Sequence, residues 1–175
     1  LIYWSIQQAL NSQKISRVIV STDCDEIAEI SKTFGAEVPF LRPKQFSLDD
    51  SSTESVLIHA VKELNLENQS IIKSVILLQP TSPIRNKNSI DEAIKTFELD
   101  NSESLVSVNK TKNFFWKKNK KPLPLYDHNS RPMRQNLKED QVFYRENGSI
   151  YITSIETLIK CKNRIGGKIS LFNMS

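Results

Sequence analysis

Arginine, glutamine and small polar residues stand at the ends of several aliphatic runs in this sequence. Arg42 and Gln79 each follow such a run, and Arg145 lies shortly before another. The planar fork of an arginine matches the oxygens of a phosphate or carboxylate group. A glutamine amide both donates and accepts hydrogen bonds, which suits a sugar hydroxyl or a nucleobase edge. These residue types predict a site for a ligand that carries phosphate and carboxylate groups.

Some polar residues have a structural alternative to a role in such a site. Asp23 can cap a helix or act as an acid, and Arg85 can pair with a nearby acid or contact the ligand. His59 lies inside a helical pattern, which favours a structural histidine, and His128 is expected to be solvated. The sequence contains no Ser-His-Asp arrangement, no HExxH motif and no complete glycine-rich phosphate loop, so it identifies no catalytic residue.

The elements that must position these residues alternate between strands and helices. Short aliphatic runs predict strands at 17–22, 37–41, 74–79, 105–108, 148–152 and 168–172, and apolar residues at helical spacing predict helices at 2–10, 23–34, 51–64, 89–97 and 154–161. This alternation is typical of βαβ units, so we predict a single α/β domain over 1–175 with a largely parallel sheet and helices on both faces. Ligands bind such sheets at the carboxyl ends of the strands.

Three helix starts carry the spacing of a capping box, in which a short polar residue precedes an acidic residue by three positions. The pairs begin at Asp23, Ser51 and Ser89. Gly35 is expected just beyond the end of the helix that starts near Asp23, since glycine adopts the left-handed conformation that ends many helices.

The stretch 110–141 breaks the alternation. It is rich in lysine and arginine, has little apolar periodicity and is long for a connection inside a compact domain. Insertions of this length are usually functional or disordered.

The totals describe an ordinary globular chain of 175 residues with 38% hydrophobic and 25% charged residues. The formal net charge of +4 is mild, and no dense basic stripe is interleaved with aromatics, so small anionic ligands are favoured over nucleic acid. No apolar run approaches the roughly 18 residues that cross a bilayer. Cys24 and Cys161 have no metal-ligand spacing, which favours reduced thiols in a cytoplasmic protein.

Four segments in collinear order resemble the acylneuraminate cytidylyltransferase family, which includes the CMP-sialic acid synthetases. They are VIVSTD at 18–23, GAEVPFLRP at 35–43, LLQPTSPIR at 77–85 and YRENGSIY at 144–151. The resemblance covers essentially the whole chain. It implies a Rossmann-like nucleotidyltransferase domain, a three-layer sandwich with a small dimerisation insert at 110–145, and therefore a homodimer. It also implies transfer of CMP from CTP to an acidic nine-carbon sugar, with magnesium as cofactor and release of pyrophosphate.

The resemblance assigns roles to individual residues on the nucleotide side. Arg42 is expected to contact the cytidine part of CTP. Ser51 and Thr53 are expected to line the base and ribose pocket, although family members vary at these two positions.

On the sugar side, the resemblance implies that Gln79 hydrogen-bonds the acceptor. The residues expected to border the sugar are Arg134, Arg145, Asn147 and Tyr151. Arg164 departs from the family, because some sialic acid enzymes have aromatic residues near this position, and the exact sugar therefore stays open.

The family's basic phosphate loop and its magnesium-binding Asp-x-Asp pair have no counterpart in these 175 residues. The chain also opens inside an apolar helical pattern and stops just after a predicted strand, so we interpret it as a fragment lacking both ends. On that interpretation no metal ligand lies in this stretch, and the stretch alone is expected to be inactive.

Two alternatives stay open: a related nucleotidyltransferase that uses another 3-deoxy-ulosonic acid of the ketodeoxyoctonate type, and a non-catalytic α/β binding module. The main reading makes one spatial prediction, that Arg42, Gln79 and Arg145 converge around one crevice at one rim of the sheet.

Overall fold

The computed structural model describes residues 1–68, 71–118 and 120–174. Its helices are α1 (Ile2–Leu10), α2 (Asp25–Thr33), α3 (Thr53–Glu63), α4 (Ser89–Leu99) and α5 (Ile155–Cys161), with short 3-10 turns η1 (Lys44–Phe46), η2 (Leu66–Asn68), η3 (Arg134–Asn136) and η4 (Glu139–Gln141). Its strands are β1 (Ser74–Leu78), β2 (Ser104–Thr111), β3 (Trp116–Lys118), β4 (Pro122–Pro124), β5 (Phe143–Ser154) and β6 (Ile169–Asn173).

Four strands form the main sheet, in the order β1-β5-β2-β6. β5 is antiparallel to β1 and to β2, whereas β2 and β6 are parallel. β1, β2 and β6 therefore run in one direction, and β5 is the exception in a mixed sheet. The predicted α/β fold is confirmed, with an antiparallel strand at the position where 148–152 was expected to continue the alternation.

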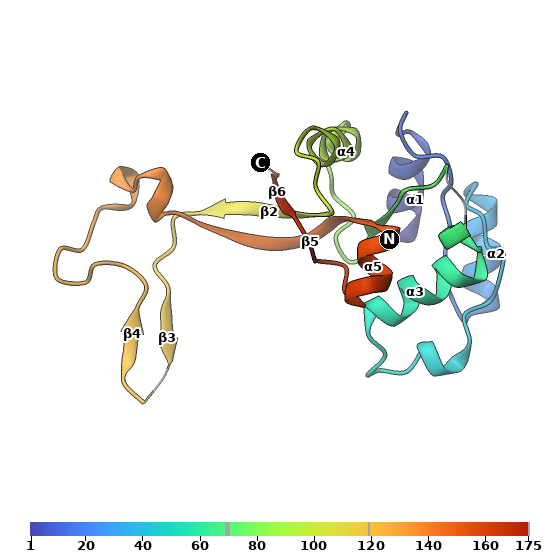
Figure 1. Ribbon diagram of the computed structural model, residues 1–175, viewed down its shortest axis with the longest axis horizontal. Helices are drawn as coiled ribbons and strands as arrows, with labels where there is room; N and C mark the ends of the chain where they lie inside the picture. Colours follow the sequence, from blue (N-terminus) through green and yellow to red (C-terminus); the bar gives the residue numbers. More distant parts are fainter. Residues whose placement is uncertain (69–70, 119, 175) are drawn as a thin grey trace.

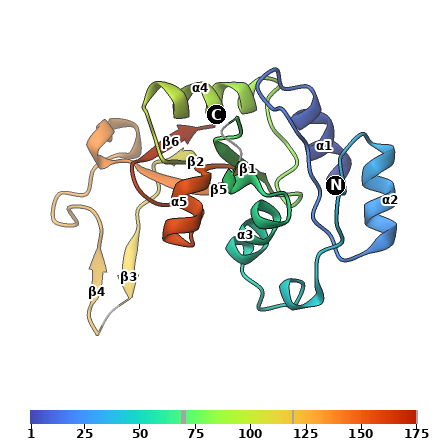
Figure 2. The ribbon, with the colours of Figure 1, turned by 45° about the vertical axis from the view of Figure 1, so that its right-hand side comes forward.

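Helices cover both faces of this sheet (Figures 1 and 2). On one face, α4 packs Ile90 and Ala93 against Leu105 of β2 and Ile152 of β5. On the other face, Val61 of α3 and Leu158 of α5 belong to a second apolar cluster. This second cluster takes Val75 from β1 and, among the described residues, none from β5, whereas Tyr151 of β5 belongs to a third cluster with Val106 and Val108 of β2.

The predicted strands 17–22 and 37–41 are reduced to a single parallel bridge. Ile19 pairs with Glu37, through hydrogen bonds from the Val20 amide to the Glu37 carbonyl (2.9 Å) and from the Glu37 amide to the Val18 carbonyl (2.8 Å). Neither segment joins the four-stranded sheet in the described part of the chain. Pro39 has no amide hydrogen, which limits how far such a pair can extend.

The predicted capping boxes are wrong in detail. The N-cap of α3 is Ser52, whose hydroxyl accepts the Ser55 amide at 3.1 Å, and not Ser51. Helices α2 and α4 begin after Cys24 and Asn88, and neither cap makes a side-chain hydrogen bond. A polar residue at the right spacing is insufficient, because the cap is the residue whose backbone leaves the helical region. Gly35 does follow the end of α2 with φ of +91°.

The basic stretch forms an arm that projects from the body (Figure 1). The β2–β5 ladder extends as far as Thr111 and Phe143, and the chain between them carries the β3–β4 hairpin. At the base of the hairpin the Arg131 guanidinium lies 4.7 Å from the centre of the Phe114 ring. The sequence showed no strand here, since two three-residue strands leave no readable alternation.

No helix in the described ranges is both long enough and apolar enough to cross a membrane.

Candidate functional site

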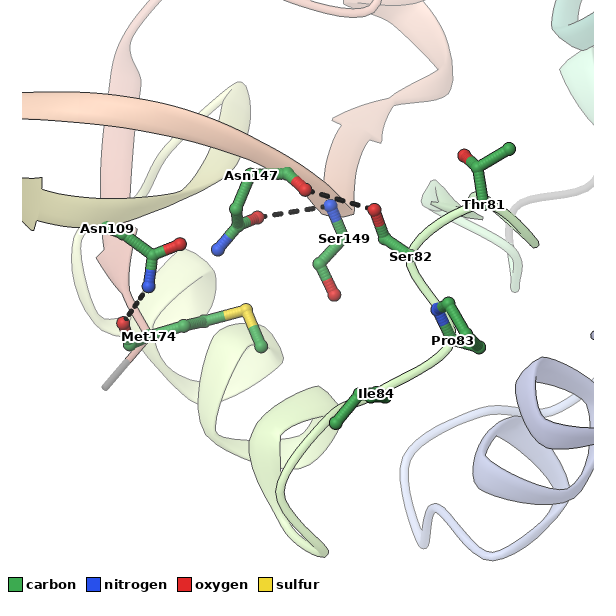
Figure 3. A pocket seen from close by; sticks show the side chains of 8 residues that line it. All are labelled: Thr81, Ser82, Pro83, Ile84, Asn109, Asn147, Ser149 and Met174. Carbon is green, nitrogen blue, oxygen red and sulfur yellow. Dashed lines mark hydrogen bonds between the residues drawn. The ribbon is translucent and has the colours of Figure 1, made fainter.

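A pocket of about 350 Å³ opens where β1, β2 and β6 end (Figure 3). It is lined by Thr81, Ser82, Pro83, Ile84, Asn109, Asn147, Ser149 and Met174. The first four follow β1, Asn109 lies late in β2, and Met174 follows β6. The pocket therefore occupies the common carboxyl edge of the three strands that share a direction, which is where ligands bind open α/β sheets.

A bulge in β5 forms one wall of this pocket. Val106 of β2 faces Tyr151, but Val108 faces Glu146, so two residue steps on β2 correspond to five on β5. The extra residues include Asn147, Gly148 and Ser149, and Gly148 has φ of +68°. Bulges of this kind redirect side chains and are common beside functional sites.

Hydrogen bonds from β2 and from the loop after β1 hold the bulge. The Ser107 hydroxyl donates to Asn147 Oδ1 at 2.6 Å and accepts the Ile150 amide at 2.7 Å. The Ser149 amide also donates to Asn147 Oδ1 (3.1 Å), and the Ser82 hydroxyl donates to the Asn147 carbonyl (3.0 Å) (Figure 3). The side-chain oxygen of Asn147 is thus occupied, and its NH₂ group has no partner within the described residues and remains available to a ligand.

Gln79 lies against the same bulge. A Cβ atom added to Gly148 would meet Gln79 Oε1 at 3.1 Å. Of the residues predicted to form the site, Gln79 and Asn147 are brought together by the structure, although they are far apart in the sequence.

Arg85 forms no ion pair with an acid within the described residues, so the first of the two roles that the sequence left open is not met. It is 8% exposed and donates to Ser5 Oγ (3.3 Å), Gln8 Oε1 (2.9 Å) and the carbonyl oxygens of Gln79 (3.3 Å) and Ser149 (2.9 Å). Burial lowers the pKa of Arg85. The side chain fastens the loop after β1 to the bulge and to α1, so it supports the pocket wall from behind.

Tyr151 is enclosed. It is 3% exposed, its hydroxyl donates to Glu146 Oε2 at 3.0 Å, and the Arg164 guanidinium lies 4.6 Å from its ring centre. Burial, reinforced by the hydrogen bond to Glu146, raises the pKa of Tyr151. Arg145 is exposed on β5, opposite Asn109.

The residues predicted to bind the nucleotide lie on other segments. Arg42 follows the parallel bridge, and its Nη2 is 3.5 Å from Asp23 Oδ1. Asp23 therefore pairs with Arg42, and the reading of Asp23 as a helix cap is wrong. The Ser51 hydroxyl accepts the Leu48 amide in the loop before α3, and Thr53 is the first residue of α3.

Arg134 lies in η3 on the arm, with its guanidinium 5.9 Å from the Phe114 ring centre. None of Arg42, Arg134 and Arg145 lines the pocket. Convergence of Arg42, Gln79 and Arg145 around one crevice stays a prediction, and Gln79 lies against Gly148 of the bulge without lining the pocket.

His59 has the structural environment that its helical position favoured. It is buried beside the rings of Phe40 and Phe46, and its Nε2 lies 3.6 Å from Glu63 Oε1.

Sequence reasoning missed Ser107 and Asn109 and gave Ser82 no role of its own, although Ser82 lies in the segment LLQPTSPIR at 77–85. Ser107 carried a usable signal, since a serine inside the aliphatic run 105–108 must find a hydrogen-bond partner when it is buried. Asn109 becomes part of the pocket only through the strand register, whereas Ser82 follows β1 at the carboxyl edge.

The described residues contain no group of three or more His, Cys, Asp and Glu side chains arranged to hold a metal ion. They therefore do not fit a magnesium site by themselves.

The comparisons with known proteins agree with the resemblance found in the sequence. Residues 1–166 match the family described as cytidylyltransferase. The chain is 36% identical over 108 residues to the pseudaminic acid cytidylyltransferase of Campylobacter jejuni, an alignment that covers 62% of this chain and 46% of that protein. It is 31% identical to the CMP-N,N'-diacetyllegionaminic acid synthase of Legionella pneumophila, over 93% of this chain and 70% of that protein. The N-acylneuraminate cytidylyltransferase of Escherichia coli is 30% identical, over 95% of this chain and 39% of that protein. The chain thus spans about half or less of the length of two of these relatives.

Solved structures share the fold at low sequence identity. A CMP:2-keto-3-deoxy-manno-octonic acid synthetase complexed with CTP superposes with a TM-score of 0.67 at 13% identity, covering 99% of this chain and 78% of that one. The 4-diphosphocytidyl-2C-methyl-D-erythritol synthase of Anaerococcus prevotii superposes with a TM-score of 0.65 at 9% identity, covering 99% and 76%. These superpositions confirm the Rossmann-like nucleotidyltransferase fold.

Proposed function

The chain belongs to the cytidylyltransferase family, and on that premise we propose that it transfers CMP from CTP to a sialic acid-like nonulosonic acid. The observation that carries this proposal is the pocket at the strand ends, where the free NH₂ of Asn147 stands beside the hydroxyl-bearing loop 81–82, and Gln79 lies against the neighbouring Gly148. Amide and hydroxyl groups at fixed positions suit a polyhydroxylated acceptor.

The names of the relatives support this class of acceptor. They are described for pseudaminic, diacetyllegionaminic and N-acylneuraminic acids, which are all acidic nine-carbon sugars. We leave the choice among these acids open, since the three relatives have similar identities to this chain.

The reaction is a displacement at phosphorus. The anomeric hydroxyl oxygen of the sugar attacks the α-phosphorus of CTP, the bond from that phosphorus to the pyrophosphate oxygen breaks, and the proton of that hydroxyl passes to a base. Such reactions depend on in-line positioning and on neutralisation of phosphate charge. Arg42, Ser51 and Thr53 are the proposed nucleotide-binding residues.

On the acceptor side, Gln79 and Asn147 would hydrogen-bond the sugar. We propose that the sugar is bordered by Arg134, Arg145 and Tyr151. The Arg164 guanidinium covers the ring of Tyr151, so Tyr151 would border the sugar as a buried residue. Magnesium remains part of the proposal for the family reaction, but the described residues offer it no ligand cluster, so none of them is given a metal-binding role.

We include a homodimer in the proposal, with the arm as its contact surface, because Trp116 and Met133 on the arm are 55% and 59% exposed. Exposed large apolar side chains on a projecting element are typical of interaction surfaces. We also propose a cytoplasmic location, since CTP is a cytoplasmic substrate and both cysteines are free thiols.

The test is an assay of CTP-dependent pyrophosphate release. The full-length gene product that contains this chain is incubated with CTP, magnesium and each of several acids: neuraminic, legionaminic, pseudaminic and ketodeoxyoctonic. Turnover with a nine-carbon acid supports the proposal, and the preferred acid identifies the acceptor. Turnover only with the eight-carbon acid would favour the related alternative, and CTP binding without turnover on any acid would favour a binding module.

A further inference from the structure

Arg164 makes an ion pair with the beginning of a distant helix. Its Nη1 lies 2.6 Å from Oε1 of Glu54, the second residue of α3, although the two residues are 110 positions apart. Both side chains are only 22% exposed. The loop that carries Arg164 is itself anchored to β5, because the Thr153 hydroxyl donates to the Arg164 carbonyl.

The same guanidinium covers the ring of Tyr151 at 4.6 Å, and the Tyr151 hydroxyl donates to Glu146. Four side chains therefore form a continuous series, Glu54–Arg164–Tyr151–Glu146. At one end, Glu54 adjoins Thr53 of the proposed nucleotide side. At the other end, Glu146 lies between Arg145 and Asn147 of the proposed sugar side.

This ion pair differs from an ordinary surface pair. Exposed pairs contribute little, because solvent and salt screen them. Here each side chain is only 22% exposed, and the guanidinium carbon lies over an aromatic ring, an arrangement that favours the cation further when water is excluded. A lysine could form the ion pair, but its compact ammonium group cannot also cover the ring as a plane.

We propose that Arg164 is a positioning residue that couples the two halves of the active site, by fixing the start of α3 relative to the segment Arg145–Asn147 of β5. The inference rests on the proposed cytidylyl transfer and assigns Arg164 no direct contact with either substrate. Two substrates that must meet in line tolerate little relative displacement of the elements that hold them.

The kinetic test compares Arg164→Gln, Glu54→Gln and the double variant in the full-length protein. Arg164→Gln is expected to lower kcat/KM for both CTP and the acid by about fivefold or more, the lower end of measured coupling between sites. The double variant is expected to be little worse than Arg164→Gln alone, because Glu54 acts through Arg164. Arg164→Lys should recover part of the loss, since it keeps the charge and loses the stacked plane.

Arg17→Gln is the matched control. Arg17 makes an ion pair of equal length, 2.6 Å, with Glu37, but this pair is more exposed and neither residue belongs to α3 or β5. The kcat/KM values of the Arg17→Gln variant should stay within about twofold of wild type. If Arg164→Gln lowers the melting temperature but leaves both kcat/KM values unchanged, its role is only structural and the inference is overturned.

A second readout separates this inference from the proposed function. The Arg164 charge lowers the pKa of Tyr151 against the larger effects of burial and Glu146, which raise it. Removing Arg164 should therefore move Tyr151 ionisation to higher pH, measured by NMR of ¹³C-labelled tyrosine with Tyr151→Phe to assign the signal. If wild type turns over no acid but this shift is seen, the proposed function fails while the contact stands. An unchanged Tyr151 titration would contradict the coupling.

Discussion

At the residue scale, Gly148 occupies a position that other residues fill only at a cost. Its φ of +68° is in the left-handed region, and a Cβ would meet Gln79 Oε1 at 3.1 Å. Gly148→Ala is expected to lower the free energy of unfolding by about 1–2 kcal/mol through the backbone alone. Chemical denaturation measures this loss.

The contact with Gln79 can be separated from the backbone effect. Combining Gly148→Ala with Gln79→Ala removes the crowding and leaves the φ angle unchanged. If the double change restored full stability relative to Gln79→Ala, the backbone explanation would be wrong.

The surroundings of Arg85 also predict the effect of replacing this residue on stability. Arg85→Met removes hydrogen bonds to Ser5, Gln8 and the carbonyl oxygens of Gln79 and Ser149, of which the Gln79 carbonyl keeps the Ser82 amide as a donor. We expect a loss of about 2–4 kcal/mol in the free energy of unfolding. The exposed Arg17→Gln should lose less than about 1 kcal/mol. Equal losses in urea denaturation would show that Arg85 does not fasten the loop to the bulge.

At the scale of elements, one hydroxyl of β2 makes two of the hydrogen bonds that hold the bulge of β5. Ser107→Ala removes the group that holds both Asn147 Oδ1 and the Ile150 amide. The Ile150 amide should then exchange with solvent faster, and acceptor binding should weaken because Asn147 is no longer oriented. Hydrogen exchange measures the first effect, with the Ile152 amide, in the regular part of β5, as an internal reference. Unchanged protection of Ile150 would show that the bulge is held by the ladder alone.

Sequence patterns predicted which segments form strands better than they predicted which strands pair with one another. The runs at 74–79 and 105–108 could be read as strands because their aliphatic residues are continuous, and both are strands of the sheet. The run at 17–22 looks similar but forms only one bridge, because pairing depends on a neighbouring strand that a local pattern does not reveal.

The sequence likewise predicted only part of the candidate site. Gln79 follows a strong strand, so its place at the carboxyl edge could be inferred. The bulge could not, since it arises from the mismatch between the β2 and β5 registers. The enclosure of Tyr151 by Arg164 was equally hidden, because it requires the loop after α5 to fold back onto β5.

At the scale of the whole molecule, the projecting arm offers a test of assembly. Met133→Asp places a charge on an exposed apolar position of the arm, and we expect it to shift the protein from dimer to monomer in light scattering coupled to size exclusion. Leu99→Asp is the control, because Leu99 is also exposed, at 71%, but lies at the end of α4 in the body. A dimer that survives Met133→Asp, or a wild-type monomer, would contradict the arm as the dimer contact.

A single strand, β5, connects the arm, the bulge and the body of the molecule. β5 begins at Phe143 where the arm meets the body, passes through the bulge, and ends at Ser154, the N-cap of α5. Whatever orders the arm, such as a second subunit, therefore acts on the same backbone that presents Asn147 to the pocket. By reciprocity, a substrate that tightens the bulge must strengthen assembly by the same factor as assembly strengthens substrate binding. Protein concentration would then regulate affinity.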